Sequence, residues 1–228
     1  MNQVATSSRG GSGHEQTSRI EARANALLED CRRAFMAFGE LDELAENLRI
    51  LSLNAELAAG RAGDKGRAVR ALTQYTRELV NRLAQIQGEM KRMDKNTDSL
   101  SEGIQADLAR LRELADADAS AAQMSEAMRD LVDKLEALSV NVEDLSRRAH
   151  GVEEVVSQSD SIATNIAIEA AAAGVHEKEF RTVSDTMRRY VDDLRKMIDE
   201  ASDGVRRALD KVEALRRLGI ETLQAMGR

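Results

Sequence analysis

Residues that could carry out chemistry are few in this sequence and lie far apart. The three histidines are His14 in a Ser/Gly-rich N-terminal stretch, His150 within a helical pattern and His176 beside a predicted turn. They do not share the short spacings that bring metal ligands together. His176 with Glu177 and Glu179 could bind a metal ion, but an exposed turn of mixed charge explains this cluster better. We therefore predict no metal site.

The sequence also offers no clear nucleophilic or phosphate-binding site. Cys31 is the single cysteine and falls at a core position of the apolar repeat, where a thiol acts as a small hydrophobic group. No nucleophile, histidine and acid can be grouped into a catalytic set. The Gly-rich stretch at 10–13 precedes neither a strand nor a phosphate-binding helix start. We expect a protein without enzymatic activity or cofactor, and a lone cysteine is compatible with a reducing compartment.

The composition is typical of long helices rather than of a mixed fold. Among 228 residues there is no proline, 2% are aromatic and 32% are charged, and the abundant Ala, Leu, Glu, Arg and Met favour helices. The net charge of −7, with both signs interspersed, indicates a solvated surface and argues against nucleic-acid binding. Because there is no apolar run of about 18 residues and no signal-peptide core, we expect a soluble cytoplasmic protein without membrane insertion. Residues 1–14 are expected to form a disordered tail.

Apolar residues recur every seven positions, which predicts coiled-coil packing of four helices of about 45–50 residues each. The first helix carries two such lines, Ile20, Leu27, Ala34, Leu41, Leu48 and Ala55 beside Ala24, Cys31, Phe38, Ala45, Ser52 and Ala59. The second carries Val69, Thr76, Leu83, Met90, Thr97, Ile104 and Leu111 beside Leu72, Leu79, Ile86, Met93, Leu100 and Leu114. Comparable lines run through 124–170 and 180–215.

The stretches 50–80 and 161–191 repeat one plan, a helix, a glycine turn and a returning helix. Gly63 and Gly174 stand where a helix needs a residue that tolerates positive φ. Gly174 lies 111 residues after Gly63, and the same shift pairs Asn54 with Asn165 without a gap. The sequence therefore predicts two helical hairpins, 15–118 and 119–228, with tips near 63–66 and 174–177.

The connection between the two hairpins, residues 113–123, leaves two architectures open. A turn is favoured because the apolar lines lose phase between Leu114 and Met124, and because Ser120 and Gln123 fit a capping box. With a turn, the hairpins form one antiparallel four-helix bundle with both tips at one end. Without a turn, a single helix of over 100 residues would carry the tips at opposite ends and would have to dimerise.

Two sets of tip residues agree with one known pattern. The first comprises Leu53, Asn54, Ala55, Ala59, Arg61, Ala62, Gly63, Gly66, Arg67 and Arg77. The second comprises Asn165, Ala167, Ile168, Glu169, Ala170, Ala171, Ala173, Gly174, Phe180, Val183, Asp185 and Arg188. At these positions the chain resembles the signalling tip of bacterial chemoreceptors, the methyl-accepting chemotaxis proteins. Ala58 and Ala172 depart from that pattern, standing where the family carries a glutamate and an arginine, so its usual trimer contacts are in doubt.

The resemblance implies an all-α, single-chain pseudo-dimer of a chemoreceptor tip, present as a monomer or a homodimer. It further implies a soluble signalling protein that docks the chemotaxis histidine kinase, its coupling protein, or both. The implied partner-binding residues are Ile50, Leu53, Asn54, Leu57, Arg61, Arg67, Asn165, Ile168, Glu169 and Lys178. Exposed apolar residues at a bundle end would mark a docking patch, although Leu53 and Leu57 could instead pack beside the core. A structural coiled-coil protein that binds an unrelated partner is the alternative function.

Overall fold

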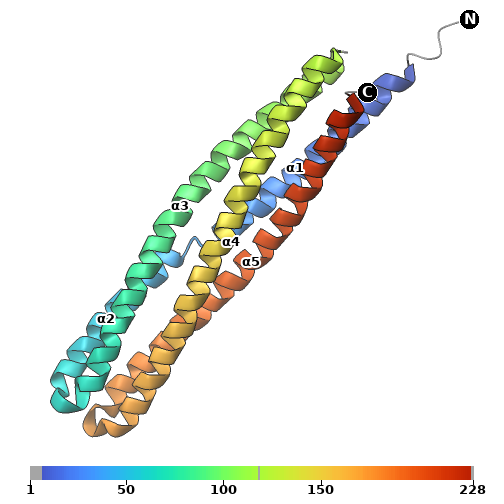
Figure 1. The fold of residues 1–228 in the computed structure, drawn as a ribbon. Coiled ribbons are helices and arrows are strands. Elements are labelled where there is room, and N and C mark those ends of the chain that lie inside the picture. The colour runs from blue at the N-terminus through green and yellow to red at the C-terminus, as the bar shows by residue number, and fades with distance from the viewer. Residues whose placement is uncertain (1–6, 118, 227–228) are drawn as a thin grey trace, which may run out of the picture. The chain divides into compact units, whose positions relative to one another are not determined.

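The structure, a computed structural model, consists of helices joined by short turns (Figure 1). It describes the backbone of residues 7–117 and 119–226 and the side chains from residue 17 onward within those ranges. The α-helices are α1 (Ser7–Met36), α2 (Leu41–Arg61), α3 (Arg67–Asp116), α4 (Ala121–Ala172) and α5 (Glu177–Met226). Two 3₁₀ turns, η1 (Gly63–Gly66) and η2 (Gly174–His176), form the hairpin tips. The described residues contain no strand, and the all-α class is confirmed.

The chain turns between α3 and α4, where the sequence left two architectures open. The Ser120 backbone N–H donates to Gln123 Oε1 at 3.2 Å, and the Gln123 backbone N–H donates to Ser120 Oγ at 3.4 Å. This is the reciprocal capping box that the sequence predicts, and it satisfies two amides that the first turn of α4 would otherwise leave unpaired. One continuous helix through this region is therefore excluded.

The chain divides into two compact units, each built from four helical segments. The stem unit takes its segments from residues 1–34, 92–146 and 203–228. Within it, side-chain contacts link each segment to the next around a closed ring. The linking ion pairs are Glu21–Arg112 (α1–α3), Asp107–Lys134 (α3–α4), Glu136–Arg216 (α4–α5) and Asp30–Lys211 (α1–α5).

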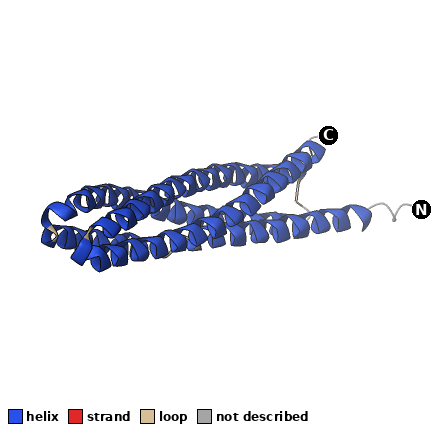
Figure 2. Cartoon of the chain, turned by 90° about the horizontal axis from the view of Figure 1, so that it is seen from below, coloured by secondary structure: helices blue, strands red, loops and turns tan. Residues whose placement is uncertain are grey.

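The tip unit comprises residues 35–91 and 147–202 and holds both hairpin tips. Its helices are linked in the same cyclic order by Glu56–Arg77 (α2–α3), Glu89–Arg148 (α3–α4), Asp160–Arg195 (α4–α5) and Arg61–Glu179 (α2–α5). The two turns lie side by side at one end of this unit (Figures 1 and 2). A four-helix arrangement with neighbouring tips is thus present within this part of the single chain.

The apolar lines predicted for the first helical stretch are all buried, but the second line predicted on α3 is buried only in part, at Leu79 and Ile86. Leu72, Met93, Leu100 and Leu114 are only half-buried, whereas Thr73, Val80 and Leu108 lie in the core. The buried face of α3 includes polar residues such as Thr73. The apolar pattern alone therefore favoured its neighbour Leu72. The hydroxyl of Thr73 is accommodated because it donates to the Arg70 carbonyl at 2.7 Å.

The predicted continuous first helix is interrupted, because α1 ends at Met36 and α2 begins at Leu41. The intervening turn is held by backbone hydrogen bonds of 3.0 Å from Phe38 to Phe35 and of 2.9 Å from Gly39 to Met36. These three-residue spacings let both Phe35 and Phe38 point into the core. The heptad pattern continues across the turn, which explains why no interruption is visible in the sequence.

Helix α1 begins at Ser7, so residues 7–14 are helical where the sequence predicts a disordered tail, and residues 1–6 lie outside the described residues. Among the described residues, no helix is long and apolar enough to cross a membrane.

The two hairpin turns use glycine in different ways. Gly63 and Gly174 adopt positive φ angles of 60° and 66°, a conformation that residues with a Cβ rarely adopt. Gly66 is required by contact instead, because a Cβ there would lie 2.1 Å from the carbonyl oxygen of Ala59. The corresponding residue of the second tip is Glu177, so this second use of glycine is confined to the first tip.

Replacing Leu48 by alanine should lower the free energy of unfolding by about 2–5 kcal/mol, because this fully buried side chain would leave a cavity. Chemical denaturation followed by circular dichroism measures the change. Leu57→Ala, at an exposed position of the same helix, is the control and should change stability by less than about 0.5 kcal/mol. Equal losses from the two variants would show that the core lies on another face of α2.

Gly66→Ala should destabilise the chain by about 1–3 kcal/mol, because the added methyl group meets backbone that cannot move freely. Gly60→Ala is the matched control. Gly60 lies in α2 with no atom within 4 Å of the added methyl position, so this substitution should stabilise the helix by up to about 1 kcal/mol. Thermal unfolding measures both, and a neutral Gly66→Ala would contradict the close contact between η1 and α2.

Candidate partner-binding site

The tip unit exposes apolar side chains along the outer face of α2. Ile50, Leu53 and Leu57 are 45%, 41% and 63% exposed. Their spacing of three and four residues places them in one stripe on a helix surface. We call these three residues the α2 stripe. The alternative that Leu53 and Leu57 pack beside the core does not hold, because both side chains face solvent.

A groove lies between α2 and α5, next to the α2 stripe. The α2/α5 groove has a cavity volume of about 680 Å³. From α2, η2 and α5 its lining includes Asn47, Ile50, Asn54, Ala58, Arg61, Val175, Lys178, Thr182 and Tyr190. Val175 is 93% exposed, and Arg61 Nη2 lies 3.4 Å from Glu179 Oε2, so an ion pair connects the two walls.

A second groove lies between the other two arms of the tip unit. The α3/α4 groove has a cavity volume of about 530 Å³ and is lined by Asp64, Lys65, Arg67, Ala68, Ala71, Glu169 and Ala172. Most of these positions correspond to lining positions of the α2/α5 groove when the hairpins are aligned on their turn glycines. The chemistry differs, because Asp64 replaces Val175 and pairs with Arg67 at 2.8 Å.

The partner-binding residues predicted from the sequence divide between the two grooves and exposed positions outside them. Ile50, Asn54, Arg61 and Lys178 come together in the α2/α5 groove. Arg67 and Glu169 line the α3/α4 groove, where Glu169 is half-buried. The remaining four are exposed outside both grooves and comprise Leu53, Leu57, Asn165 and Ile168.

Sequence reasoning missed several residues of the α2/α5 groove, among them Asn47, Val175, Glu179 and Tyr190. An apolar residue directly after the glycine of an exposed turn was the one available signal for Val175. Asn47 and Tyr190 carry no comparable signal, because they become neighbours only through the packing of α2 against α5.

Hydrogen bonds at equivalent positions hold the arms of each hairpin together beneath these surfaces. In the first hairpin Ser52 Oγ on α2 donates to the Thr73 carbonyl on α3 at 3.1 Å. In the second, Ser184 Oγ on α5 donates to the Ala163 carbonyl on α4 at 2.8 Å. The alignment pairs Ser52 with Ala163 and Thr73 with Ser184, so the same two positions are joined with the donor on the opposite arm. Both hairpins therefore have a fixed spacing of their arms near the tip.

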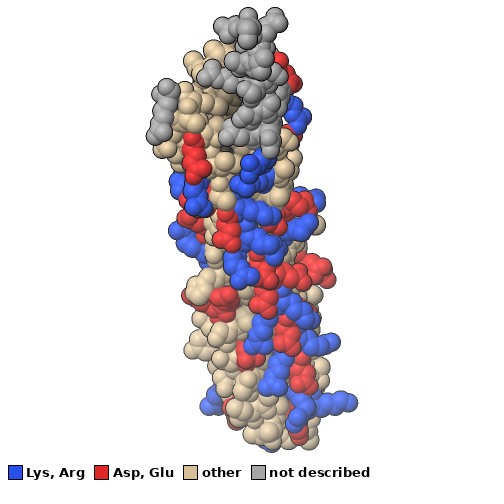
Figure 3. Space-filling view, turned by 90° about the vertical axis from the view of Figure 1, so that its right-hand side faces the viewer, with Lys and Arg blue, Asp and Glu red and all other residues tan. Residues whose placement is uncertain are grey.

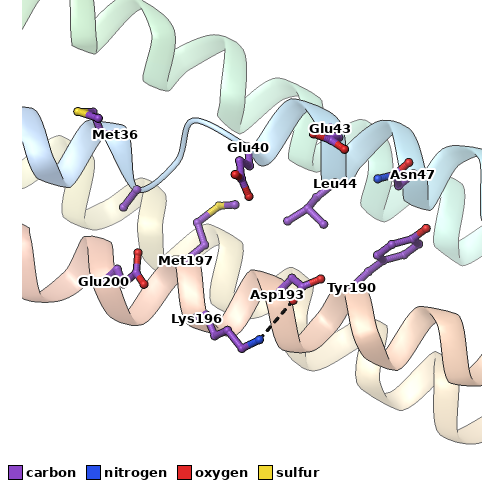
Figure 4. A pocket seen from close by; sticks show the side chains of 11 residues that line it. Met36, Glu40, Glu43, Leu44, Asn47, Tyr190, Asp193, Lys196, Met197 and Glu200 are labelled. Atoms are coloured by element: carbon purple, nitrogen blue, oxygen red, sulfur yellow. Dashed lines mark hydrogen bonds and ion pairs between the residues drawn. The ribbon is translucent and has the colours of Figure 1, made fainter.

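A third cavity in the tip unit lies beside the turn between α1 and α2 (Figure 4). Its volume is about 550 Å³, and Glu40, Glu43, Asp193 and Glu200 give its rim an acidic character. Lys196 lies 3.5 Å from Asp193 and offsets part of this charge. These ionic groups are exposed to water, so their arrangement is that of a solvated rim.

The reactive residue types have ordinary structural surroundings. Burial, with a smaller contribution from the neighbouring Asp30, raises the pKa of the Cys31 thiol to about 12, so the thiol stays protonated near neutral pH. His176 Nδ1 lies 3.9 Å from Glu179 Oε2, and its ring stands 6.5 Å from that of Phe180. No group of three or more His, Cys, Asp or Glu residues in the described part of the chain could hold a metal ion.

Charged residues of both signs alternate on the visible face in Figure 3. Toward the lower end of that view, which holds the hairpin tips, uncharged surface lies beside the charged side chains. Since no large area of one sign stands out on this face, contact with a partner here would depend on local pairs and apolar side chains.

Comparison with known proteins finds a similarity to a chemotaxis receptor. The methyl-accepting chemotaxis protein PctB of Pseudomonas aeruginosa is 28% identical to the chain over 120 residues, which cover 46% of this chain and 19% of PctB. The chain therefore matches about a fifth of the length of that relative. No protein-family model and no solved structure matches the chain. The chain is thus similar, over part of its length, to a chemotaxis receptor.

Proposed function

We propose that the chain is a chemoreceptor-like signalling module that docks the chemotaxis histidine kinase or its coupling protein through the tip unit. It acts as a binding protein rather than an enzyme, and it works in the cytoplasm. The observation that carries the proposal is the α2 stripe beside the α2/α5 groove, in a region whose sequence resembles a chemoreceptor tip. The similarity to PctB supports the same class of function.

The α2 stripe has the properties of a contact surface for a protein. Apolar residues at positions i, i+3 and i+7 of a helix present a continuous strip that a partner can cover. Burying such surface gains about 25 cal/mol per Å², whereas leaving it in water gains nothing.

The tip unit also limits the entropic cost of binding. The Ser52–Thr73 and Ser184–Ala163 hydrogen bonds hold the arms, and the Gly66–Ala59 contact fixes the first turn against α2. A surface that is already ordered loses less conformational freedom when a partner docks. More of the apolar contact energy is then available as affinity.

A structural coiled-coil protein that binds an unrelated partner is the competing function. Such a protein needs the buried core and the turns, but it does not need Leu53 and Leu57 exposed on one face. The two functions therefore differ in how binding responds to substitutions in the α2 stripe.

The test uses the purified chain with the chemotaxis kinase and coupling protein of the same bacterium. Leu53→Glu/Leu57→Glu should weaken binding by about tenfold or more, because two carboxylates would have to be desolvated at the contact. Isothermal titration calorimetry measures the dissociation constants, and circular dichroism verifies the fold. Val140→Glu, at an exposed apolar position of the stem unit, is the control and should bind as the native chain does.

Failure of the folded native chain to bind either protein would show that the docking function is wrong and would favour the structural alternative. Unchanged binding of the double variant would place the contact away from the α2 stripe.

A further inference from the structure

We infer that each chain has one docking groove, the α2/α5 groove, and binds one partner molecule although it carries two hairpin tips. The inference rests on the proposed function. It adds that one partner binds per chain and that it binds at the α2/α5 groove. It follows from comparing the two grooves position by position, which the gap-free repeat makes possible.

Two apolar residues that line the α2/α5 groove have polar residues at their equivalent positions. Ile50 of the α2/α5 groove corresponds to Ser161 in the second hairpin, and Val175 corresponds to Asp64 in the first. Val175 and the side chain of Asp64 are both highly exposed, each at 93%. A partner surface gains free energy by covering Ile50 and Val175. At the equivalent positions the same surface would have to desolvate the Ser161 hydroxyl and the Asp64 carboxylate, which costs free energy.

The floors of the two grooves differ in size and charge. Ala58, which is buried, lines the α2/α5 groove, whereas its equivalent Glu169 brings a half-buried carboxylate to the wall of the α3/α4 groove. A methyl group leaves space for an incoming side chain, and a glutamate occupies that space.

The charges beside the grooves indicate what the partner presents. Arg61 and Glu179 neutralise each other across the α2/α5 groove, and Lys178 forms no ion pair with another residue of the described part of the chain. Its equivalent in the first hairpin, Arg67, is already paired with Asp64 at 2.8 Å. The α2/α5 groove therefore fits a protein surface with an apolar side chain, seated over Ala58 between Ile50 and Val175, and a carboxylate within reach of Lys178.

The experiment combines a stoichiometry with three single variants, of which Ile50→Glu and Ser161→Glu form a matched pair. Titration of the native chain with the purified kinase or coupling protein should give one partner per chain. Ile50→Glu and Val175→Asp should each weaken binding by about tenfold. Ser161→Glu, at the position equivalent to Ile50, should leave the dissociation constant within about twofold. These positions are exposed, and a thermal melt of each variant verifies that it folds.

A gain-of-function variant tests the same inference from the other side. Ser161→Ile/Asp64→Val/Glu169→Ala places three residues of the α2/α5 groove at the equivalent positions of η1 and α4, and it should raise the stoichiometry toward two partners per chain. A native stoichiometry of two, or equal weakening by Ile50→Glu and Ser161→Glu, would overturn the inference and leave the proposed function standing. No binding by the folded native chain would instead overturn the proposed function, and the single groove with it.

Discussion

The structure depends on the burial of an apolar stripe that no helix of the chain can cover alone. Each helix carries apolar residues at heptad spacing, and charged residues occupy the rest of its surface. An isolated hairpin would cover only part of each stripe, because two helices leave one side of their contact open to water. In the tip unit the two hairpins cover one another, with Leu48 and Ala59 on α2 and Phe180 and Val191 on α5 all buried. The turn between α3 and α4 is what makes this arrangement possible within a single chain.

Joining the hairpins covalently changes the thermodynamics of their association. Two separate hairpin chains must meet at a rate and with an affinity that depend on their concentration. Here the second hairpin is always present at the effective concentration that the connection provides, which short flexible links bring into the millimolar range. The α2–α5 contacts of the tip unit, including the Arg61–Glu179 ion pair, therefore form without a bimolecular step.

Much of the fold could be predicted because its determinants are local. The heptad lines of the first helical stretch, the turn glycines and the Ser120–Gln123 box each act over a few residues and were identified correctly. The turn after Met36 could not be predicted, because hydrogen bonds such as Phe38 to Phe35 preserve the heptad phase that a sequence reading follows. The burial of Thr73 in place of Leu72 was missed because Thr73 is polar and Leu72 is not.

The candidate site was predicted less completely, for a different physical reason. Exposure of Leu53 and Leu57 depends on how wide a stripe α2 buries, which the sequence left undecided. The groove itself consists of residues more than 120 positions apart, such as Asn54 and Val175, so it exists only once α2 lies against α5. Lys178 and Ile50 were identified through resemblance to a family, whereas their shared groove required the structure.

The reversed serine hydrogen bonds have a consequence for how such a protein can evolve. In a homodimer every substitution appears twice, so a change that helps one copy of a site is imposed on the other copy as well. In this chain Ser52 and Ser184 fill the same role from opposite arms, and each was free to be kept or lost separately. One chain can thus retain one hairpin for packing while its other hairpin accumulates the residues of a specialised surface. Two identical chains cannot become different in this way by point mutation, because every substitution changes both.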